Sequence, residues 1–497
     1  MIRKICAGAA FAAALTVSFV AHAATPVPQV SGPIPVTAAS HPFGAANQTL
    51  KPENLAAAGY VEEEYFVSGK ANVYDWQAGG AVVRTADVPY TTRVLVRRPK
   101  SAGKFSGRVI VEMMNPTNLL DLNIGWAIHR DELMRRGDAW VGLTAKPIAV
   151  KTLQTFDPAR YAPLNWANPL PASDPRNCAV RAGGDTTQAT ENGLVWDMNT
   201  QVGAWIRSNT AANPFTYGGR ATRAKYLYGW GYSQTGGYLY TYVNAIHPLV
   251  VKADGKSMFD GYLIATASGP SAINQCAPAI PAGDPHRKPA HVGVPVMHVM
   301  TNSDYAGFAP SRLPDNNTLA EGYRDYDLSG AGHATPDELY YGPSPADITK
   351  GGQTPPPVNC TEGPRSRFPS RVPFNAILEN LEDWVEKGKT PPPGAVVLMN
   401  GNTGALDEYG NVKGGVRTPY LDVPTSTWAG NSTGPSFCRI AGHETPFTPD
   451  RLKALYPTHA DYVRKVEASV DSLVAQRYIT RADGAAIIAE ARATKVP

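Results

Sequence analysis

The segment from Tyr226 to Leu239 contains the residues best suited to nucleophilic chemistry. It reads Tyr-Leu-Tyr-Gly-Trp-Gly-Tyr-Ser-Gln-Thr-Gly-Gly-Tyr-Leu, so an apolar strand pattern runs through a glycine-rich turn into a helical pattern. Ser233 lies at the turn, where its hydroxyl can project free of a sheet toward a base. This layout is typical of a nucleophile elbow, usually written G-x-S-x-G. Here Thr235 takes the second small position and Gly236 follows it.

A serine nucleophile needs a histidine base, and the histidine needs an orienting carboxylate. In the architecture that uses a nucleophile elbow, the expected chain order is serine, acid, histidine. Asp304 comes just after a strand pattern at 294–300, and His333 comes just after another at 323–328. Sites in open α/β sheets form at the carboxyl ends of parallel strands. We therefore expect Ser233, Asp304 and His333 to meet at one edge of a sheet.

Other carboxylates stay open as the orienting acid. Asp325 and Asp327 lie on the strand before His333, and Glu321 precedes that strand. Asp304 is the preferred assignment because it comes after the end of its strand, where the carboxyl ends of parallel strands form a site.

The developing oxyanion needs hydrogen-bond donors. The backbone N–H of Gln234, directly after the serine, is the first expected donor. A second should come from the loop Asn115-Pro-Thr-Asn118, which follows the strand pattern at 108–114. Pro116 has no N–H, so the Asn115 or Thr117 backbone, or an asparagine side chain, is expected to donate.

Two other motifs match hydrolase patterns. Gly430-Asn-Ser-Thr-Gly434 fits G-x-S-x-G letter for letter, but no apolar strand precedes it and Pro435 follows at once, which is typical of a loop. Ser101-Ala-Gly-Lys104 fits the S-x-x-K of serine–lysine enzymes, yet it lies between two strand patterns and opens no helix. A serine–lysine mechanism would make Lys104 essential and His333 dispensable.

The elements that would position these residues alternate along the chain. Helical patterns occur at 125–136, 191–207 and 374–387. Strand patterns occur at 60–76, 90–98, 108–114, 139–144, 226–228, 259–265, 294–300 and 323–328. Repeated strand–crossover–strand order predicts an α/β fold of the α/β-hydrolase type, with a mostly parallel sheet and helices on both faces. The patterns at 60–76 and 90–98 predict antiparallel strands at its edge.

Residues 25–497 are expected to form one domain. A long irregular stretch near 146–190 exceeds a plain connection and predicts a lid or cap. Residues 340–497 form a region rich in Pro and Gly that ends in helices at 449–494. Thr480-Arg-Ala-Asp483 resembles a capping box for the last of these helices.

Residues 1–24 are typical of a secretory signal peptide. Arg3 and Lys4 precede an apolar run, and Ala21-His-Ala23 supplies a cleavage pattern, so we expect export after cleavage near Ala23 or Ala24. The mature chain keeps four cysteines, which in an exported protein predict two disulfides with three possible pairings. These cysteines are Cys178, Cys276, Cys360 and Cys438.

Composition excludes several function classes. The 497 residues are 43% hydrophobic and 18% charged, which is ordinary globular usage and excludes wholesale disorder. The formal net charge is only +4, and it falls to +2 when Arg3 and Lys4 are removed, so no electrostatic footprint for nucleic acid is expected. Beyond the N-terminus no apolar stretch is long enough to span a bilayer. No zinc-ligand spacing occurs, and nothing calls for a metal or an organic cofactor.

The chain resembles the bacterial alpha/beta hydrolase domain family, in particular large secreted members with a G-x-S-x-[ST]-G elbow. The matching segments spread over most of the mature chain, which implies that the C-terminal region belongs to the same unit. They lie at 109–115, 157–161, 231–236, 301–304, 330–333, 414–419 and 445–447. The resemblance implies a serine hydrolase fold.

A secreted serine esterase acting on a small-molecule ester or lactone is the function that these observations favour. His333 would accept the proton of Ser233, and Asp304 would stabilise the imidazolium. The alternative is a non-catalytic exported binding protein that keeps the fold, because fold alone does not fix function.

Overall fold

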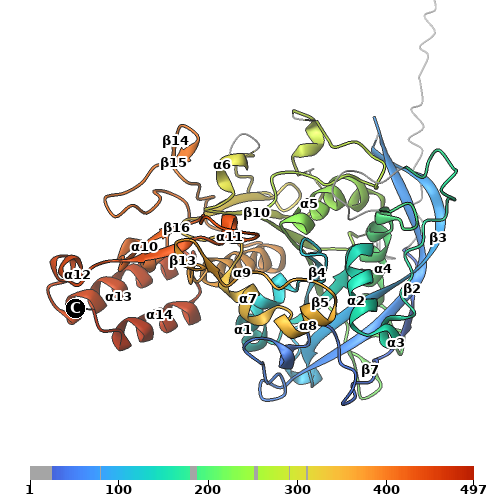
Figure 1. Ribbon diagram of the computed structural model, residues 1–497, viewed down its shortest axis with the longest axis horizontal. Helices are drawn as coiled ribbons and strands as arrows, with labels where there is room; N and C mark the ends of the chain where they lie inside the picture. Colours follow the sequence, from blue (N-terminus) through green and yellow to red (C-terminus); the bar gives the residue numbers. More distant parts are fainter. Residues whose placement is uncertain are drawn as a thin grey trace, which may run out of the picture.

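A nine-stranded sheet runs through the protein in the order β1-β2-β3-β5-β4-β8-β9-β10-β11 (Figure 1). The computed structural model describes residues 25–78, 80–178, 187–250, 256–281, 283–289, 292–308 and 312–496, so the predicted signal peptide lies outside the described residues. The strands of the sheet are β1 (Gln29–Ser31), β2 (Tyr60–Gln77), β3 (Gly80–Pro99), β4 (Arg108–Met114), β5 (Ala139–Thr144), β8 (Tyr226–Tyr232), β9 (Gly261–Ala265), β10 (Val296–Thr301) and β11 (Tyr323–Leu328).

The sheet is parallel from β5 to β11 and antiparallel at its other edge. β4 pairs in parallel with β5 and β8, and β9, β10 and β11 continue the parallel order. β2 and β3 form a long antiparallel hairpin that joins β5 and carries β1. The predicted fold class and the antiparallel edge are confirmed.

Each face of the sheet packs against its own helices because side chains alternate along every strand. On β4, Val109, Val111 and Met113 join the core under α4 and α5, whereas Ile110 and Met114 join the core under α1 and α9. Helices on both faces are therefore confirmed. Their bounds are α1 (Ile124–Arg136), α4 (Val195–Arg207), α5 (Gln234–Thr241) and α9 (Arg371–Lys387).

Part of the stretch that we predict as irregular, 146–190, is helical. α2 (Pro147–Phe156) and α3 (Pro158–Tyr161) both begin with proline. Proline is well tolerated in the first turn of a helix, where its missing N–H has no helical partner to lose. Val150, Leu153 and Phe156 are buried in the core. The prolines of this stretch start helices, and the prediction of irregular structure is wrong at this point.

The remaining helices and strands, apart from those at the C-terminus, are short and are joined by loops. The disulfides are Cys178–Cys276 and Cys360–Cys438, one of the three pairings that the sequence leaves open. The elements are η1 (Ala46–Gln48), η2 (Ala102–Lys104), η3 (Asn192–Leu194), β6 (Thr216–Tyr217), β7 (Arg220–Ala221), η4 (Tyr242–Ile246), η5 (His247–Leu249), η6 (Pro285–Arg287), α6 (Tyr305–Phe308), α7 (Pro336–Tyr341), α8 (Pro345–Lys350), β12 (Asn359–Cys360), β13 (Gly363–Pro364), β14 (Met399–Asn400), β15 (Thr403–Gly404), α10 (Pro419–Asp422), β16 (Ser426–Ala429), α11 (Cys438–Ala441) and β17 (His443–Pro446).

Three C-terminal helices project from the body of the molecule (Figure 1). They are α12 (Pro449–Leu455), α13 (His459–Ala475) and α14 (Arg481–Ala493), and they share a small hydrophobic core. Thr480 caps the last helix as the predicted pattern requires, since its hydroxyl accepts the N–H of Asp483 at 3.0 Å; the Asp483 carboxylate accepts from the Thr480 hydroxyl at 2.8 Å.

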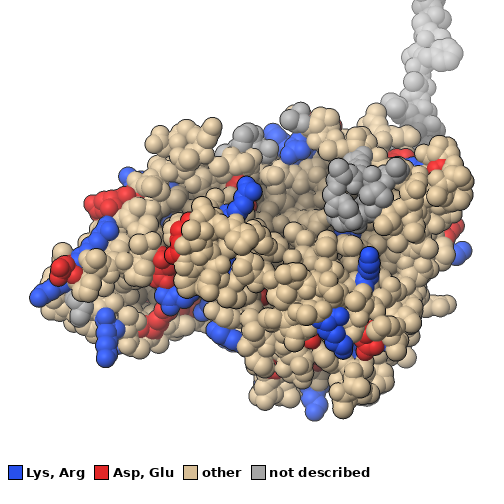
Figure 2. Space-filling model, in the orientation of Figure 1, with Lys and Arg blue, Asp and Glu red and all other residues tan. Residues whose placement is uncertain are grey.

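Charged side chains are mixed in sign over the molecular surface that Figure 2 shows, and no continuous patch of one sign covers this face. Within the described ranges, none of the helices combines the length and the apolar character that crossing a bilayer would require.

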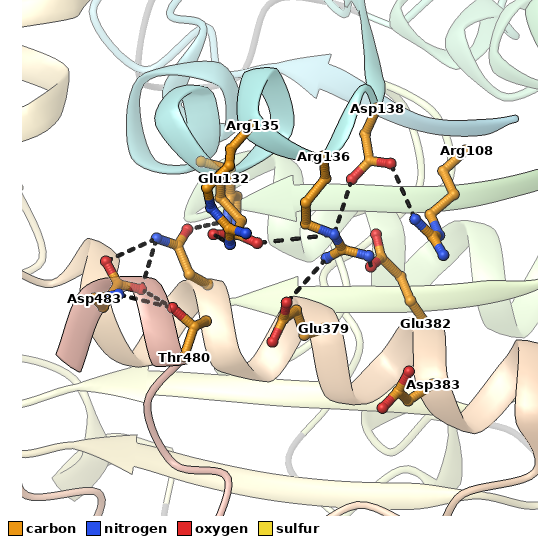
Figure 3. A network of polar contacts seen from close by, with 12 residues as sticks. Arg108, Glu132, Arg135, Arg136, Asp138, Glu379, Glu382, Asp383, Thr480 and Asp483 are labelled. Atoms are coloured by element: carbon orange, nitrogen blue, oxygen red, sulfur yellow. Dashed lines mark hydrogen bonds and ion pairs between the residues drawn. The ribbon is translucent and has the colours of Figure 1, made fainter. Parts of the chain in front are cut away.

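A network of buried charges joins α1 to α9. Figure 3 shows Arg136, at the end of α1, reaching toward Glu379 and Glu382 on α9. Arg136 pairs with Glu382 and lies 3.5 Å from Asp138, whose other oxygen is 3.3 Å from Arg108. The side chains of Glu382 and Asp138 are 1% and 0% exposed, so water cannot reach either carboxylate; Arg136 supplies the cation paired with Glu382 and shares Asp138 with Arg108. This charge balance holds the two helices together on one face of the sheet.

Replacing Arg136 should therefore cost much more than replacing an exposed cation. We expect Arg136→Met to lower the free energy of unfolding by about 3–5 kcal/mol, because it removes the cation that pairs with the buried Glu382 carboxylate. Lys387→Met, on the same helix as Glu382 but 61% exposed, should lower it by less than about 1 kcal/mol. Equilibrium urea unfolding followed by circular dichroism measures both, and similar losses in the two variants would contradict the assignment.

Candidate active site

Ser233 lies in a sharp turn between β8 and α5. Its backbone has φ 57° and ψ −119°, a region that residues other than glycine rarely occupy. The conformation is held from the neighbouring strand, since the Ser233 N–H donates to the Ala265 carbonyl and to the Thr266 hydroxyl, each at 2.9 Å. The strained turn separates the serine from the regular backbone of both elements, as a nucleophile elbow requires.

Two glycines make room for this turn. A Cβ atom on Gly231 would lie 2.3 Å from the Thr235 carbonyl oxygen, and one on Gly236 would lie 2.5 Å from the Ala265 carbonyl oxygen. Thr235 itself is tolerated because its hydroxyl turns back and donates to the Tyr232 carbonyl at 3.2 Å. The close approach falls on Gly236, which explains why the pattern reads G-x-S-x-T-G.

His333 and Asp304 form a direct pair. The Nδ1 atom of His333 lies 2.9 Å and 3.1 Å from the two carboxylate oxygens of Asp304. The Thr301 hydroxyl donates to the same carboxylate, and the Asp304 N–H donates to the Thr301 carbonyl at 3.0 Å. A proton on Nδ1 shared with Asp304 leaves Nε2 as the free basic nitrogen.

The other candidate acids have different partners. Asp325 pairs with His298 at 3.0 Å and with Arg312 at 2.9 Å. Asp327 also pairs with Arg312 and accepts the Val397 N–H. Glu321 is exposed on a loop. Of the four carboxylates, Asp304 is the one that contacts His333.

The backbone of His333 is held by hydrogen bonds to both its N–H and its carbonyl. The His333 N–H donates to the Ser303 hydroxyl at 3.0 Å, and that hydroxyl donates to the Gly430 carbonyl at 2.7 Å. The Tyr232 hydroxyl donates to the His333 carbonyl at 2.6 Å, and the two rings meet edge to face with centroids 5.3 Å apart. The residue just before Ser233 therefore helps to fix the backbone of His333.

The environment of His333 favours its protonated form. Burial would lower the pKa of the imidazole, but the Asp304 carboxylate and, more weakly, Glu338 outweigh that effect, and the pKa of His333 is raised. A base of this kind gains strength as a proton acceptor, and it is free to accept a proton only above its raised pKa.

Ser233 and His333 line the same cavity, whose volume is about 90 Å³. Its other walls come from the chain before α1, from the proline-rich segment 343–358, and from Phe437 and Ile440. Among the described residues of 146–190, none lines this cavity, so the predicted lid there stays a prediction. The lining residues from the C-terminal half belong to no sequence motif, so the sequence does not predict that they line the cavity. Two of them, Glu338 and Arg365, are charged.

The expected oxyanion donors lie beside Ser233. Gln234 opens α5, where the first backbone N–H groups have no helical partner. The backbone N–H of Asn115 is paired with the Leu122 carbonyl at 3.0 Å, and that of Thr117 with the Asn115 side-chain oxygen at 2.7 Å. The side-chain amide of Asn115 donates to the Tyr232 carbonyl at 2.7 Å and also lines the cavity. Of the donors expected from this loop, the Asn115 amide keeps a second hydrogen.

The competing motifs lie elsewhere. Ser432 is in a loop after β16, where its hydroxyl is 3.2 Å from Nδ1 of His443. Ser101 and Lys104 are both exposed at η2. His129 is buried on α1, where burial lowers its pKa to about 4 and Asn375 is its partner at 3.1 Å. In the part of the chain that the structure describes, no three His, Cys, Asp or Glu residues are placed to hold a metal ion.

The elbow predicts a large effect from a very small substitution. Gly231→Ala should displace Ser233 and slow its labelling by a fluorophosphonate by about 10²-fold, since a shift of about 1 Å at a reacting atom has that cost. Gly103→Ala is the matched control, because a Cβ there meets nothing within 4 Å. Labelling rates are measured by mass spectrometry on folded protein. Wild-type labelling of Gly231→Ala would contradict the role of the turn.

Comparison with known proteins gives one family match. The profile described as "Alpha/beta hydrolase domain" matches residues 30–489. No curated protein matches the chain.

Several solved structures are similar at low identity. An alpha/beta serine hydrolase without lid from Xanthomonas campestris is 12% identical, with 49% of this chain and 80% of that chain covered and a TM-score of 0.26. A CE15 glucuronoyl esterase from Teredinibacter turnerae T7901 is 10% identical, with 66% and 79% covered and a TM-score of 0.27. An alpha-beta serine hydrolase homologue from Coxiella burnetii is 12% identical, with 54% and 91% covered and a TM-score of 0.25.

Proposed function

The chain belongs to the alpha/beta hydrolase domain family, and on that premise we propose that it is an exported serine hydrolase cleaving carboxylic esters or lactones. One observation carries the proposal: Ser233, at a strained turn, and His333, paired with Asp304, line one cavity. The three residues follow the ends of β8, β10 and β11. In the parallel part of the sheet these strands lie in the order β8-β9-β10-β11.

The reaction begins with proton transfer from the Ser233 hydroxyl to Nε2 of His333. The serine oxygen attacks the ester carbonyl, while Asp304 stabilises the imidazolium that forms. The Gln234 N–H and the Asn115 amide donate to the oxyanion. The alcohol leaves with the proton from His333, water then attacks the acyl-enzyme with His333 as base, and the acid is released.

The cavity suits a small substrate group. Its volume of about 90 Å³ is well below the roughly 300–1,000 Å³ of sites that enclose drug-sized ligands. Most of its lining side chains are aliphatic or proline, so a short apolar acyl or alcohol group fits it. No cofactor enters the proposed reaction.

Export is part of the same proposal. The signal-peptide pattern at 1–24 supports it, and so do the disulfides Cys178–Cys276 and Cys360–Cys438, which persist in oxidising compartments. We also propose that residues 25–497 act as one unit, since Leu50, Ser233 and Ile440 line one cavity.

Ser233→Ala should abolish the activity. We expect hydrolysis of p-nitrophenyl acyl esters to fall at least about 10³-fold and fluorophosphonate labelling to disappear. Ser432→Ala is the control, since it removes the serine of the literal G-x-S-x-G match, and it should keep both activities. If folded wild-type protein is not labelled at all, the non-catalytic binding protein is the better account.

The pH profile should report the His333–Asp304 pair. We expect kcat/KM to rise with pH through the raised pKa of His333, because only the neutral imidazole accepts the serine proton. Asp304→Asn removes the negative charge that raises this pKa, so the midpoint should move to lower pH while the plateau falls. Rates between pH 5 and 9 test this. A midpoint that stays in place in Asp304→Asn would exclude Asp304 as the orienting acid.

A further inference from the structure

Glu338 and Arg365 place an ion pair in the wall of the Ser233 cavity. Glu338 is on α7, whose N-cap Thr335 comes two residues after His333. Arg365 follows β13, in the segment next to the Cys360–Cys438 disulfide. The Nη2 atom of Arg365 lies 3.2 Å from Oε1 of Glu338, and both residues line the cavity with Ser233 and His333. The catalytic reaction proposed above uses neither residue.

The pair has unused hydrogen-bonding capacity. The side chain of Arg365 is only 4% exposed, and its Nε–H has no hydrogen-bond partner among the described residues. Glu338 is 17% exposed, and in the described ranges its second carboxylate oxygen receives no hydrogen bond. The Arg365 Nε–H is itself sealed from the cavity, so the unpaired group that a ligand can reach is the second oxygen of Glu338. Buried polar groups in native proteins are nearly always satisfied, so this acceptor in the wall of the Ser233 cavity points to a ligand group that donates to it.

Charge balance limits what that group can be. Glu338 and Arg365 neutralise each other, and the nearby Asp304 adds a second negative charge to the site. An anionic substituent would compete with Glu338 for Arg365, and a cationic one would meet a carboxylate that already has its counter-charge. A hydroxyl group fits the pair, because it carries no charge and donates to the free Glu338 oxygen, while Arg365 holds the other oxygen of that carboxylate.

We propose that the Glu338–Arg365 pair is a specificity determinant that binds a neutral hydroxyl group on the substrate. This inference rests on the proposed ester hydrolysis at Ser233. The rest of the cavity wall is mostly apolar, so an unsubstituted alkyl ester enters it but leaves the pair unsatisfied. Sites built to hydrogen-bond a substrate hydroxyl discriminate strongly against the analogue that lacks it. The surrounding apolar residues include Leu50, Leu122, Ile124, Leu339 and Ile348.

Matched ester series test the proposal on the wild-type protein. One series pairs hydroxyalkyl acetates with n-alkyl acetates, and the other pairs methyl ω-hydroxyalkanoates with methyl alkanoates, each over several chain lengths and measured by pH-stat. We expect one series to contain a hydroxylated ester whose kcat/KM exceeds that of its unsubstituted counterpart at least tenfold. Ratios near one throughout, or a preference for esters carrying a carboxylate or an ammonium group, would overturn it.

Variants assign the preference to the pair. In Arg365→Met and in Glu338→Gln the ratio of kcat/KM for the hydroxylated to the unsubstituted ester should fall toward one, measured on the pH plateau of each variant. Arg367→Met, two residues away and 72% exposed, should keep the wild-type ratio. A variant that keeps the preference would exclude its residue from hydroxyl binding.

Fluorophosphonate labelling separates the two proposals. If Ser233 is labelled and unsubstituted esters are cleaved but no hydroxyl preference exists, the specificity proposal fails and the hydrolase stands. If Ser233 is not labelled and no ester is cleaved, the proposed function fails, and the specificity proposal falls with it.

Discussion

The site depends on holding one serine in a backbone conformation that serine disfavours. A residue other than glycine at such φ and ψ values costs about 1–3 kcal/mol, so the surroundings must impose it. At Ser233 they do so through hydrogen bonds to Ala265 and Thr266 at the end of the adjacent strand β9. This turn requires glycine at positions 231 and 236, because it leaves no room for a Cβ atom at either one.

The histidine is fixed by contacts that cross most of the chain. Ser303 bridges the His333 N–H to the Gly430 carbonyl, and Tyr232 holds the His333 carbonyl. Strand, turn and C-terminal loop thus share one small set of hydrogen bonds around the imidazole. In the proposed reaction, an imidazole held in this way acts as a base without reorganising, which is how enzymes obtain much of their electrostatic stabilisation. The contact of Gly430 with Ser303 supports the proposal that residues 25–497 act as one unit.

The sequence allows the sheet and the proposed triad positions to be predicted, because both depend on local order. Apolar strand patterns give the ends of β10 and β11 to within one residue, and Asp304 and His333 follow those ends. The pattern at 226–228 stops four residues before β8 ends, and the glycine-rich turn is what identifies Ser233. The cavity walls depend on contacts between residues far apart in the chain, for which no local pattern exists. Glu338 and Arg365 look like ordinary surface charges in the sequence. Proline predicts a loop as readily as a helix start, so the sequence alone does not distinguish the helices α2 and α3 from irregular chain.

The proline content has a physical reason in the wall of the cavity. Irregular backbone around an apolar space is costly because each N–H group that faces it lacks a partner. Proline removes the N–H and fixes φ, so a segment rich in proline can line such a space with little polar exposure and little residual freedom. Pro343, Pro345, Pro355 and Pro356 all line the cavity beside Ser233. The Cys360–Cys438 disulfide then joins the end of this segment to α11, next to Phe437 and Ile440. The apolar wall of the cavity is thereby built from loops and short helices, whereas the proposed reacting groups follow strands of the regular sheet.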